Sequence, residues 1–351
     1  MKKILSIILI MLIVFMCIGC GREKEPDKIN IGVSMPSSGA LYQNQGGNAI
    51  KNALVQAGYS VELQYADNDA EIQVKQIKYL IERDCRVIVV QPIDSEALAD
   101  ILQEAKEKEI AVISYDDLIM NSDSVSYYVA FDKSIIGRLQ GKYIAEKLKL
   151  DECAEGEAYT IEICSGIAGD ADSRIYYDGA MDVLKQYIDS GVLYVPSGEI
   201  SYEETCEENE DALYNRIVNM LNDYYSDEII LDAVLCVDDS SALSVSEAID
   251  YNYNGDFPII TGNGCTLYSV RKIADNRQTM SVFENPKLLS DKTAELVNAL
   301  LNGTGVSASE SLNNGSIDVP AFICEPYVID AGNYKSEIID SGYYTETQIY
   351  D

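Results

Sequence analysis

The chain has 351 residues, of which 47% are hydrophobic and 24% charged, so it can form two domains with cores of their own and is not disordered. Its 58 acidic and 26 basic residues give a formal net charge of −32, and such a surface repels nucleic acid and anionic lipid. The chain contains no histidine, which excludes Ser-His-Asp and Cys-His catalysis and removes the commonest metal ligand.

The N-terminal segment has the pattern of a secretion signal. Lys2 and Lys3 precede the apolar run ILSIILIMLIVFMCIG, which ends before Cys20 and the charged stretch GREKEPDK. The run is short for a membrane span, which needs about 20 apolar residues, and it resembles a lipoprotein signal. We therefore expect residues 1–19 to be a signal peptide, Cys20 to carry lipid that anchors the chain outside the cell, and residues 20–28 to be a tether. An uncleaved anchor helix is the alternative, and it leaves the remainder in the same place.

Short apolar strands then alternate with amphipathic helices, as in β-α-β proteins. The run RVIVVQPI is continuously apolar, which is typical of a strand covered on both faces of its sheet. Ser95 is the expected N-cap of the helix that follows it. This order predicts a doubly wound parallel sheet. The expected strands span 29–35, 60–66, 86–93 and 110–116, and the expected helices span 46–58, 70–84 and 95–109.

The alternation starts again beyond residue 126, which predicts a second α/β lobe. We expect the chain to cross between the lobes near Phe131–Asp132, Phe283–Glu284 and Asp318–Val319. The N-terminal lobe then comprises 29–131 plus 284–318, and the C-terminal lobe comprises 132–283 plus 319–351. The expected strands are 127–132, 159–166, 191–199, 232–239, 257–263, 278–285 and 319–330, with helices at 134–149, 173–189, 208–226, 241–251, 266–275 and 287–302.

Acids and amides gather where the predicted strands end. Ligands of open α/β sheets bind outside the carboxyl ends of the strands, so two facing lobes would form one cleft with many hydrogen-bond acceptors. Such a cleft suits a neutral polyhydroxylated ligand or a cationic one. For any single acid, capping of the next helix is as good an explanation as ligand binding. It explains the whole set less well.

Seven cysteines follow Cys20, and none belongs to a CxxC pair. Without histidine they indicate neither a metal site nor a resident cofactor. Several lie in apolar runs such as DAVLCVDD, so we expect small core residues and no disulfide bond.

Several ordered segments carry a family resemblance. They are VSMP (33–36), QIKYLIERDCRVIVV (76–90), AVISYDDLIMNSDSVSYYVAFD (111–132), DAVLCVDD (232–239) and DSGYYTETQI (340–349). From Ile29 onward the chain resembles the xylose and multiple-sugar branch of the ribose-type, or type 1, periplasmic binding proteins. These are the extracytoplasmic receptors of ABC sugar importers. The resemblance implies two α/β lobes joined by three hinge strands, a monomer that closes on one aldose, and a membrane permease as partner.

The resemblance also implies the ligand-binding positions of this chain. They are Tyr42, Gln43, Asp116, Asp117, Asp170, Asp172, Asp239, Asn263 and Glu284.

Several of these positions depart from the family pattern. Tyr42–Gln43 replace an arginine and an aromatic residue, Asp117 replaces an arginine, and Glu284 replaces the hinge lysine. Asp172 falls in an expected asparagine pair, and Asn263 lies where the family motif continues to a carboxylate that is missing here. An expected stacking tryptophan is also absent.

These replacements leave two interpretations of the cleft. It binds a different ligand, such as an aminated or cation-bridged one, or it has lost tight sugar binding and serves another task. The function hypotheses are accordingly a substrate receptor for an importer and a sensory receptor that signals to a membrane kinase or chemoreceptor. A glycosidase is disfavoured because the adjacent Asp116 and Asp117 cannot flank a glycosidic bond. A DNA-binding repressor is disfavoured by the net charge and the secretion signal.

Overall fold

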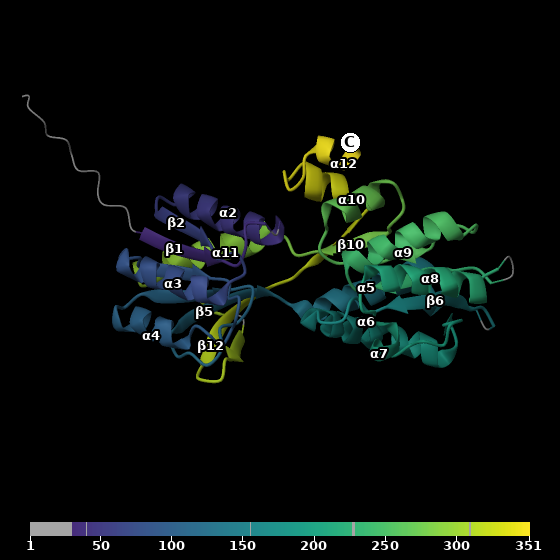
Figure 1. The fold of residues 1–351 in the computed structure, drawn as a ribbon, viewed down its shortest axis with the longest axis horizontal. Helices are drawn as coiled ribbons and strands as arrows, with labels where there is room; N and C mark the ends of the chain where they lie inside the picture. Colours follow the sequence, from purple (N-terminus) through teal and green to yellow (C-terminus); the bar gives the residue numbers. More distant parts are fainter. Residues whose placement is uncertain (1–29, 40, 155, 227–228, 309) are drawn as a thin grey trace, which may run out of the picture.

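The computed structural model describes residues 30–39, 41–154, 156–226, 229–308 and 310–351. The expected signal peptide, the tether and Cys20 lie outside the described residues. The chain forms two lobes joined by a narrow waist (Figure 1). No helix in the described part of the chain is long and apolar enough to cross a membrane.

The N-terminal lobe is built on a seven-stranded sheet in the order β11-β12-β5-β4-β3-β1-β2. All neighbouring pairs are parallel except β11 with β12. Helices α2 and α11 cover one face and α3 and α4 the other, as two separate apolar clusters show. The strands are β1 (Asn30–Met35), β2 (Ser60–Tyr65), β3 (Val87–Val90), β4 (Ala111–Tyr115), β5 (Val125–Phe131), β11 (Glu310–Asn313) and β12 (Asp318–Cys324). The helices are α2 (Leu41–Gln56), α3 (Ala70–Glu82), α4 (Ala99–Glu107) and α11 (Pro286–Asn302).

The C-terminal lobe repeats this arrangement with the parallel order β7-β6-β8-β9 and an antiparallel pair, β10 with β13. Helices α5 and α6 cover one face and α8 and α9 the other. The strands are β6 (Tyr159–Cys164), β7 (Leu193–Tyr194), β8 (Ala233–Cys236), β9 (Ile259–Ile260), β10 (Met280–Phe283) and β13 (Tyr327–Asp330). The helices are α5 (Lys133–Leu148), η1 (Leu150–Glu152), α6 (Ala171–Ser190), α7 (Tyr202–Thr205), α8 (Glu210–Tyr224), α9 (Asp239–Asn252), α10 (Leu267–Ala274), η2 (Lys335–Ile339) and α12 (Glu346–Tyr350).

Helices α5 and α6 pack unusually closely, and glycine makes this possible. A Cβ atom on Gly137 would collide with the backbone carbonyl of Tyr176 on α6, and one on Gly141 would lie 2.9 Å from the carbonyl oxygen of Ala180. The contact matters for the waist because both helices begin there. It sets Lys133, the first residue of α5, beside Asp172 in the first turn of α6.

Three segments cross the waist. They follow Phe131 at the end of β5, Phe283 at the end of β10, and Cys324 at the end of β12. The expected third crossing at Asp318–Val319 is wrong, because β12 pairs with β5 inside the N-terminal lobe. The run 319–330 was predicted as one strand, but Glu325–Pro326 divide it into β12 and β13. The N-terminal lobe therefore contains residues 284–324, and the C-terminal lobe resumes at residue 325.

Several element boundaries differ from the sequence predictions. Helix α2 begins at Leu41 instead of residue 46, and the expected strand 191–199 is reduced to Leu193–Tyr194. Ser95 does not cap α4, which begins at Ala99 after Leu98 without a side-chain cap. The short elements α7, β11, η2 and α12 were not predicted.

All seven cysteines of the described residues are free, as expected. Four of them, Cys85, Cys164, Cys236 and Cys265, are buried and pack in apolar clusters.

Candidate functional site

The site begins where β4 ends at the waist. Asp116 follows the strand with a φ of 67°, a left-handed conformation that is uncommon for a residue with a side chain, although aspartate tolerates it better than most. Two hydrogen bonds hold this turn: the Asp116 N–H donates to the Val129 carbonyl at 2.7 Å, and the Tyr128 hydroxyl donates to the Asp116 carbonyl at 2.9 Å. The neighbouring strand β5 thus fixes where the Asp116 side chain lies.

The carboxylate of Asp116 is 7% exposed and has two donors from its own lobe. Gln91 Nε2 donates to Oδ2 at 2.8 Å, and the Tyr42 hydroxyl donates to Oδ1 at 3.3 Å. Burial, together with the charges of Asp117 and Glu284, raises the pKa of Asp116 to about 8. The structure thus brings together Tyr42 and Asp116, two of the positions that the family resemblance implies.

Lys133 connects the two lobes electrostatically. Its Nζ lies 3.1 Å from Oδ1 of Asp117 in the N-terminal lobe and 2.9 Å from Oδ2 of Asp172 in the C-terminal lobe. Burial lowers the pKa of Lys133, but the charge of Asp117 and the hydrogen bond to Asp172 outweigh it, so the pKa is raised and the side chain stays protonated. The sequence analysis missed Lys133, although its place directly after the first expected crossing could have indicated it.

Glu284 lies on the second crossing and is partly buried. Its pKa is raised to about 7, because burial outweighs the lowering by the charge of Lys133 and by a hydrogen bond with Asn263. The charges of Asp172 and Asp117 act on it as well. Four predicted carboxylates therefore share the surroundings of Lys133: Asp116, Asp117, Asp172 and Glu284.

Asp239 is placed differently, because donors of its own lobe surround its carboxylate. It accepts hydrogen bonds from Thr266 N–H at 2.7 Å, Ser281 Oγ at 2.7 Å and Gln278 Nε2 at 3.2 Å. Burial raises its pKa to about 6, and these donors hold it lower than burial alone would. Asp239 therefore joins the start of α9 to the start of α10 and to β10, and its ligand role stays a prediction.

Asp170 illustrates the capping explanation. It is exposed, and its Oδ1 accepts a hydrogen bond from the Asp172 N–H at 2.9 Å as the N-cap of α6. The remaining two predicted residues, Gln43 and Asn263, are partly buried, and the side-chain oxygen of each is buried without a hydrogen-bond partner among the described residues.

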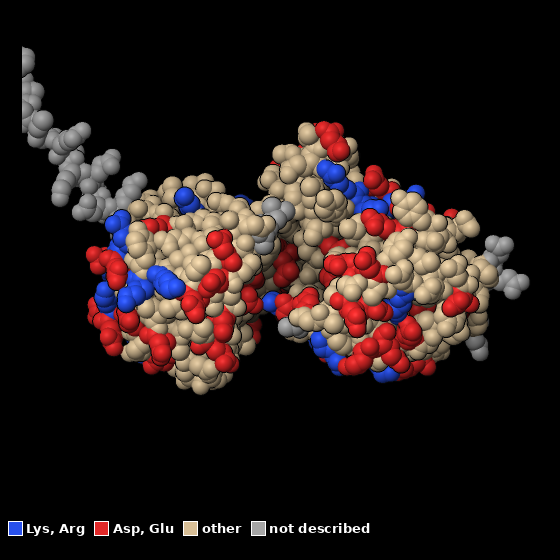
Figure 2. Space-filling view, in the orientation of Figure 1, with Lys and Arg blue, Asp and Glu red and all other residues tan. Residues whose placement is uncertain are grey.

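Acidic side chains are visible where the two lobes face each other, and a small patch of basic atoms lies beside them (Figure 2). In the described part of the chain, no group of three or more acidic or cysteine side chains is arranged to hold a metal ion. The site therefore offers hydrogen-bond acceptors and negative charge.

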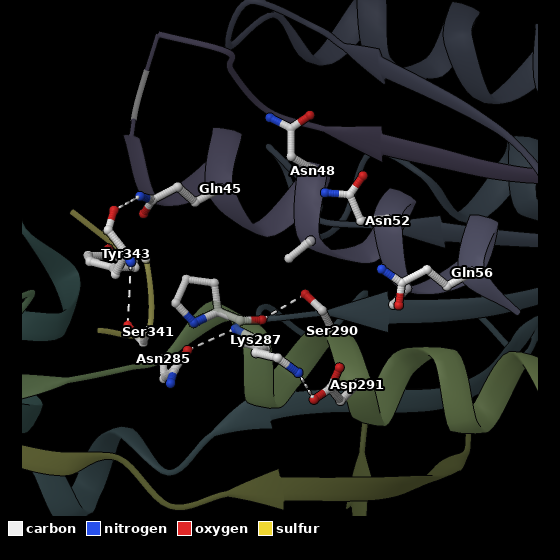
Figure 3. Close-up of a pocket in the computed structure, with 14 residues that line it drawn as sticks. Gln45, Asn48, Asn52, Gln56, Asn285, Lys287, Ser290, Asp291, Ser341 and Tyr343 are labelled. Carbon is white, nitrogen blue, oxygen red and sulfur yellow. Dashed lines mark hydrogen bonds and ion pairs between the residues drawn. The ribbon is translucent and has the colours of Figure 1, made fainter. Parts of the chain in front are cut away.

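A separate cavity of about 420 Å³ lies beside the waist, between α2, α11 and the C-terminal segment (Figure 3). A row of amides on α2 lines it, and Gln45 Nε2 donates to the Tyr343 carbonyl at 3.2 Å, which joins the two lobes here. Lys287 and Asp291 pair with each other on the opposite wall. None of the nine predicted ligand-binding residues lines this cavity.

Comparison with known proteins agrees with this architecture. The sequence model of the periplasmic binding protein domain matches residues 31–305. The chain is 35% identical to the multiple sugar-binding periplasmic protein SbpA of Azospirillum brasilense over 94% of both chains. It is 35% identical to the multiple sugar-binding periplasmic receptor ChvE of Rhizobium radiobacter, over 92% of this chain and 93% of the receptor.

A solved structure is also similar. The crystal structure of an ABC transporter solute-binding protein from Clostridium phytofermentans with bound β-D-glucose is 42% identical and superposes with a TM-score of 0.74. The match covers 91% of this chain and 99% of that protein.

Proposed function

Because the chain belongs to the periplasmic binding protein family, a family of solute-binding proteins and not of enzymes, we propose that it is the extracytoplasmic substrate receptor of an ABC importer. Its ligand is a monosaccharide-sized polyhydroxylated solute, which is held between the two lobes. The relatives named as multiple sugar-binding proteins and the glucose-bound structure support this ligand class.

The buried carboxylate of Asp116 at the waist is the observation that carries the proposal. A carboxyl group in this position accepts hydrogen bonds from ligand hydroxyls, and when it is ionised these charge-assisted bonds are about twice as strong as neutral ones. Tyr42 and Gln91 orient the carboxylate before a ligand arrives, which lowers the entropy lost on binding. Three crossings provide the hinge about which the lobes would close.

The proposal includes a lipid anchor at Cys20. The signal pattern of residues 1–19 supports it, because cleavage before Cys20 leaves a thiol for lipid attachment. Lipid on Cys20 would keep the receptor beside its permease. Mass spectrometry of the mature chain tests this. An N-terminal diacylglyceryl cysteine is the expected result, and an unmodified Cys20 would contradict the anchor.

Titration calorimetry against a panel of aldoses tests the binding function. We expect one site per chain for at least one aldose, and loss of about tenfold or more in affinity in the Asp116→Asn variant, because the amide replaces one acceptor oxygen of the carboxyl group with an N–H donor. Asparagine also tolerates positive φ, so the turn is preserved. Asp100→Asn, an exposed aspartate on α4, is the matched control and should bind like the parent chain. Absence of binding across the panel would overturn the proposal.

A further inference from the structure

The charge balance of the cleft is negative. Asp117, Asp172 and Glu284 surround Lys133, and the carboxylate of Asp116 acts on the same lysine. The two carboxylates that pair with Lys133 already outnumber it, so the cleft retains negative charge when these three groups are ionised, and ionisation of Asp116 or Glu284 adds to it. A neutral sugar would not compensate this charge.

A buried amide gives independent evidence for a missing donor. Gln91 is 4% exposed, and its Oε1 has no hydrogen-bond partner among the described residues, while its Nε2 donates to Asp116. An unpaired buried polar atom is unfavourable unless a ligand or water satisfies it. The side-chain oxygens of Gln43 and Asn263 are in the same condition. The three unpaired atoms are all hydrogen-bond acceptors, so a ligand with several hydrogen-bond donors would satisfy them.

The geometry favours an organic cation over a metal ion. No group of three acids in the described residues is arranged to hold a metal, whereas a hard cation needs six or more oxygen ligands at about 2.0–2.6 Å. A protonated amine requires only a few acceptors at ordinary hydrogen-bond distance and has three donors.

We infer that the preferred ligand of this cleft is an aminated monosaccharide, whose ammonium group faces the carboxylates around Lys133 and whose hydroxyls meet the unpaired amide oxygens. This inference rests on the proposed binding function and specifies its substrate class. It assigns Asp117 and Glu284 a role in specificity, because each adds negative charge where the ammonium group would lie.

Paired titrations test the inference. The probes are glucosamine, galactosamine and mannosamine, each compared with its parent sugar at a pH of about 6.5, where the amines are protonated. We expect at least one amino sugar to bind about 10-fold or more tightly than its parent, because a hydrogen bond between charged groups contributes about 1.5–3 kcal/mol. Added salt should weaken the amino sugar more than the parent sugar.

Variants that replace one acidic side chain with its neutral amide test whether that side chain sets the preference for amino sugars. In Asp117→Asn the ratio of amino-sugar to parent-sugar affinity should fall by about threefold or more, since the variant removes a carboxylate that pairs with Lys133. In Glu284→Gln the ratio should fall less, because a carboxyl group with a pKa of about 7 is only partly ionised at this pH. Asp182→Asn, an exposed aspartate on α6 that pairs with Arg138, is the matched control and should keep the ratio.

The outcomes separate the two proposals. If a parent sugar binds and no amino sugar binds more tightly, the inference is wrong and the binding function stands. If the preference exists but neither variant reduces it, the inference is also wrong, because the ammonium group then lies elsewhere. If none of the probes binds and the wider aldose panel is silent as well, the binding function itself fails.

Discussion

At the scale of single residues, Asp116 combines a left-handed backbone with a buried carboxylate. Its pKa of about 8 in the folded chain exceeds the value of about 3.9 in an unfolded chain. The protonated form is therefore favoured by folding. Its stabilising contribution is complete below a pH of about 4 and is lost as the pH rises through about 8.

We accordingly expect the free energy of unfolding of the ligand-free chain to fall as the pH rises from about 5 to about 8.5. Asp116→Asn should reduce this fall by at least about 1 kcal/mol, since one pKa unit corresponds to about 1.4 kcal/mol. Glu284 and Asp239 have raised pKa values too, so part of the slope should persist. Urea unfolding at several pH values measures it, and an unchanged slope in the variant would contradict the buried, protonated Asp116.

Single residues also show how much of the candidate site could be predicted from the sequence. Asp116, Asp117 and Glu284 lie at the ends of predicted strands, so the rule that strand ends meet at one edge could place them together. Tyr42 and Asp172 came only from the family resemblance. The roles of Asp170 and Asp172 could not be separated, because two residues on one turn differ only in which of them caps the helix. Lys133 was missed because its function depends on carboxylates that approach it from both lobes.

At the scale of elements, the close packing of α5 against α6 sets the position of Lys133. Gly137→Ala should destabilise the chain by about 1–3 kcal/mol, because the added methyl group must push the helices apart. Lys142→Ala, an exposed change on the same helix, is the control and should have little effect. Chemical denaturation measures both, and equal stabilities would show that the helices can separate without cost.

Most strands and helices were predictable, because the alternation of apolar runs and helical faces is strong in both lobes. The third crossing was not, because an apolar run does not show which sheet accepts its backbone hydrogen bonds. The segment VPAFIC pairs with β5, and YVID pairs with β10 in the other lobe. The short helices α7 and α12 are too brief to show a helical period.

At the scale of the whole molecule, Lys133 links the lobes through Asp117 and Asp172. Lys133→Met removes this cation and leaves the carboxylates facing one another, so the ligand-free chain should open further at a pH of about 8 than the parent chain. Small-angle scattering should show a larger radius of gyration, and the difference should shrink at a pH of about 5, where Asp116 and Glu284, whose pKa values are raised to about 8 and about 7, are protonated.

The double variant Lys133→Met with Asp117→Asn is the matched control for that measurement. It lowers the repulsion between the lobes, so its radius of gyration should return toward that of the parent chain. If the Lys133→Met variant is as compact as the parent chain, the ion pairs of Lys133 do not influence the separation of the lobes.

The exchange of strands across the waist also has a consequence for biosynthesis. Strand β12 inserts beside β5, a partner made about 190 residues earlier, and β13 completes the other lobe from the last few dozen residues. Neither lobe can finish its sheet until nearly the entire polypeptide is available, and contacts so distant in sequence form slowly. The nascent protein would thus stay unfolded while it emerges, the state in which a secretion channel can thread it through a membrane.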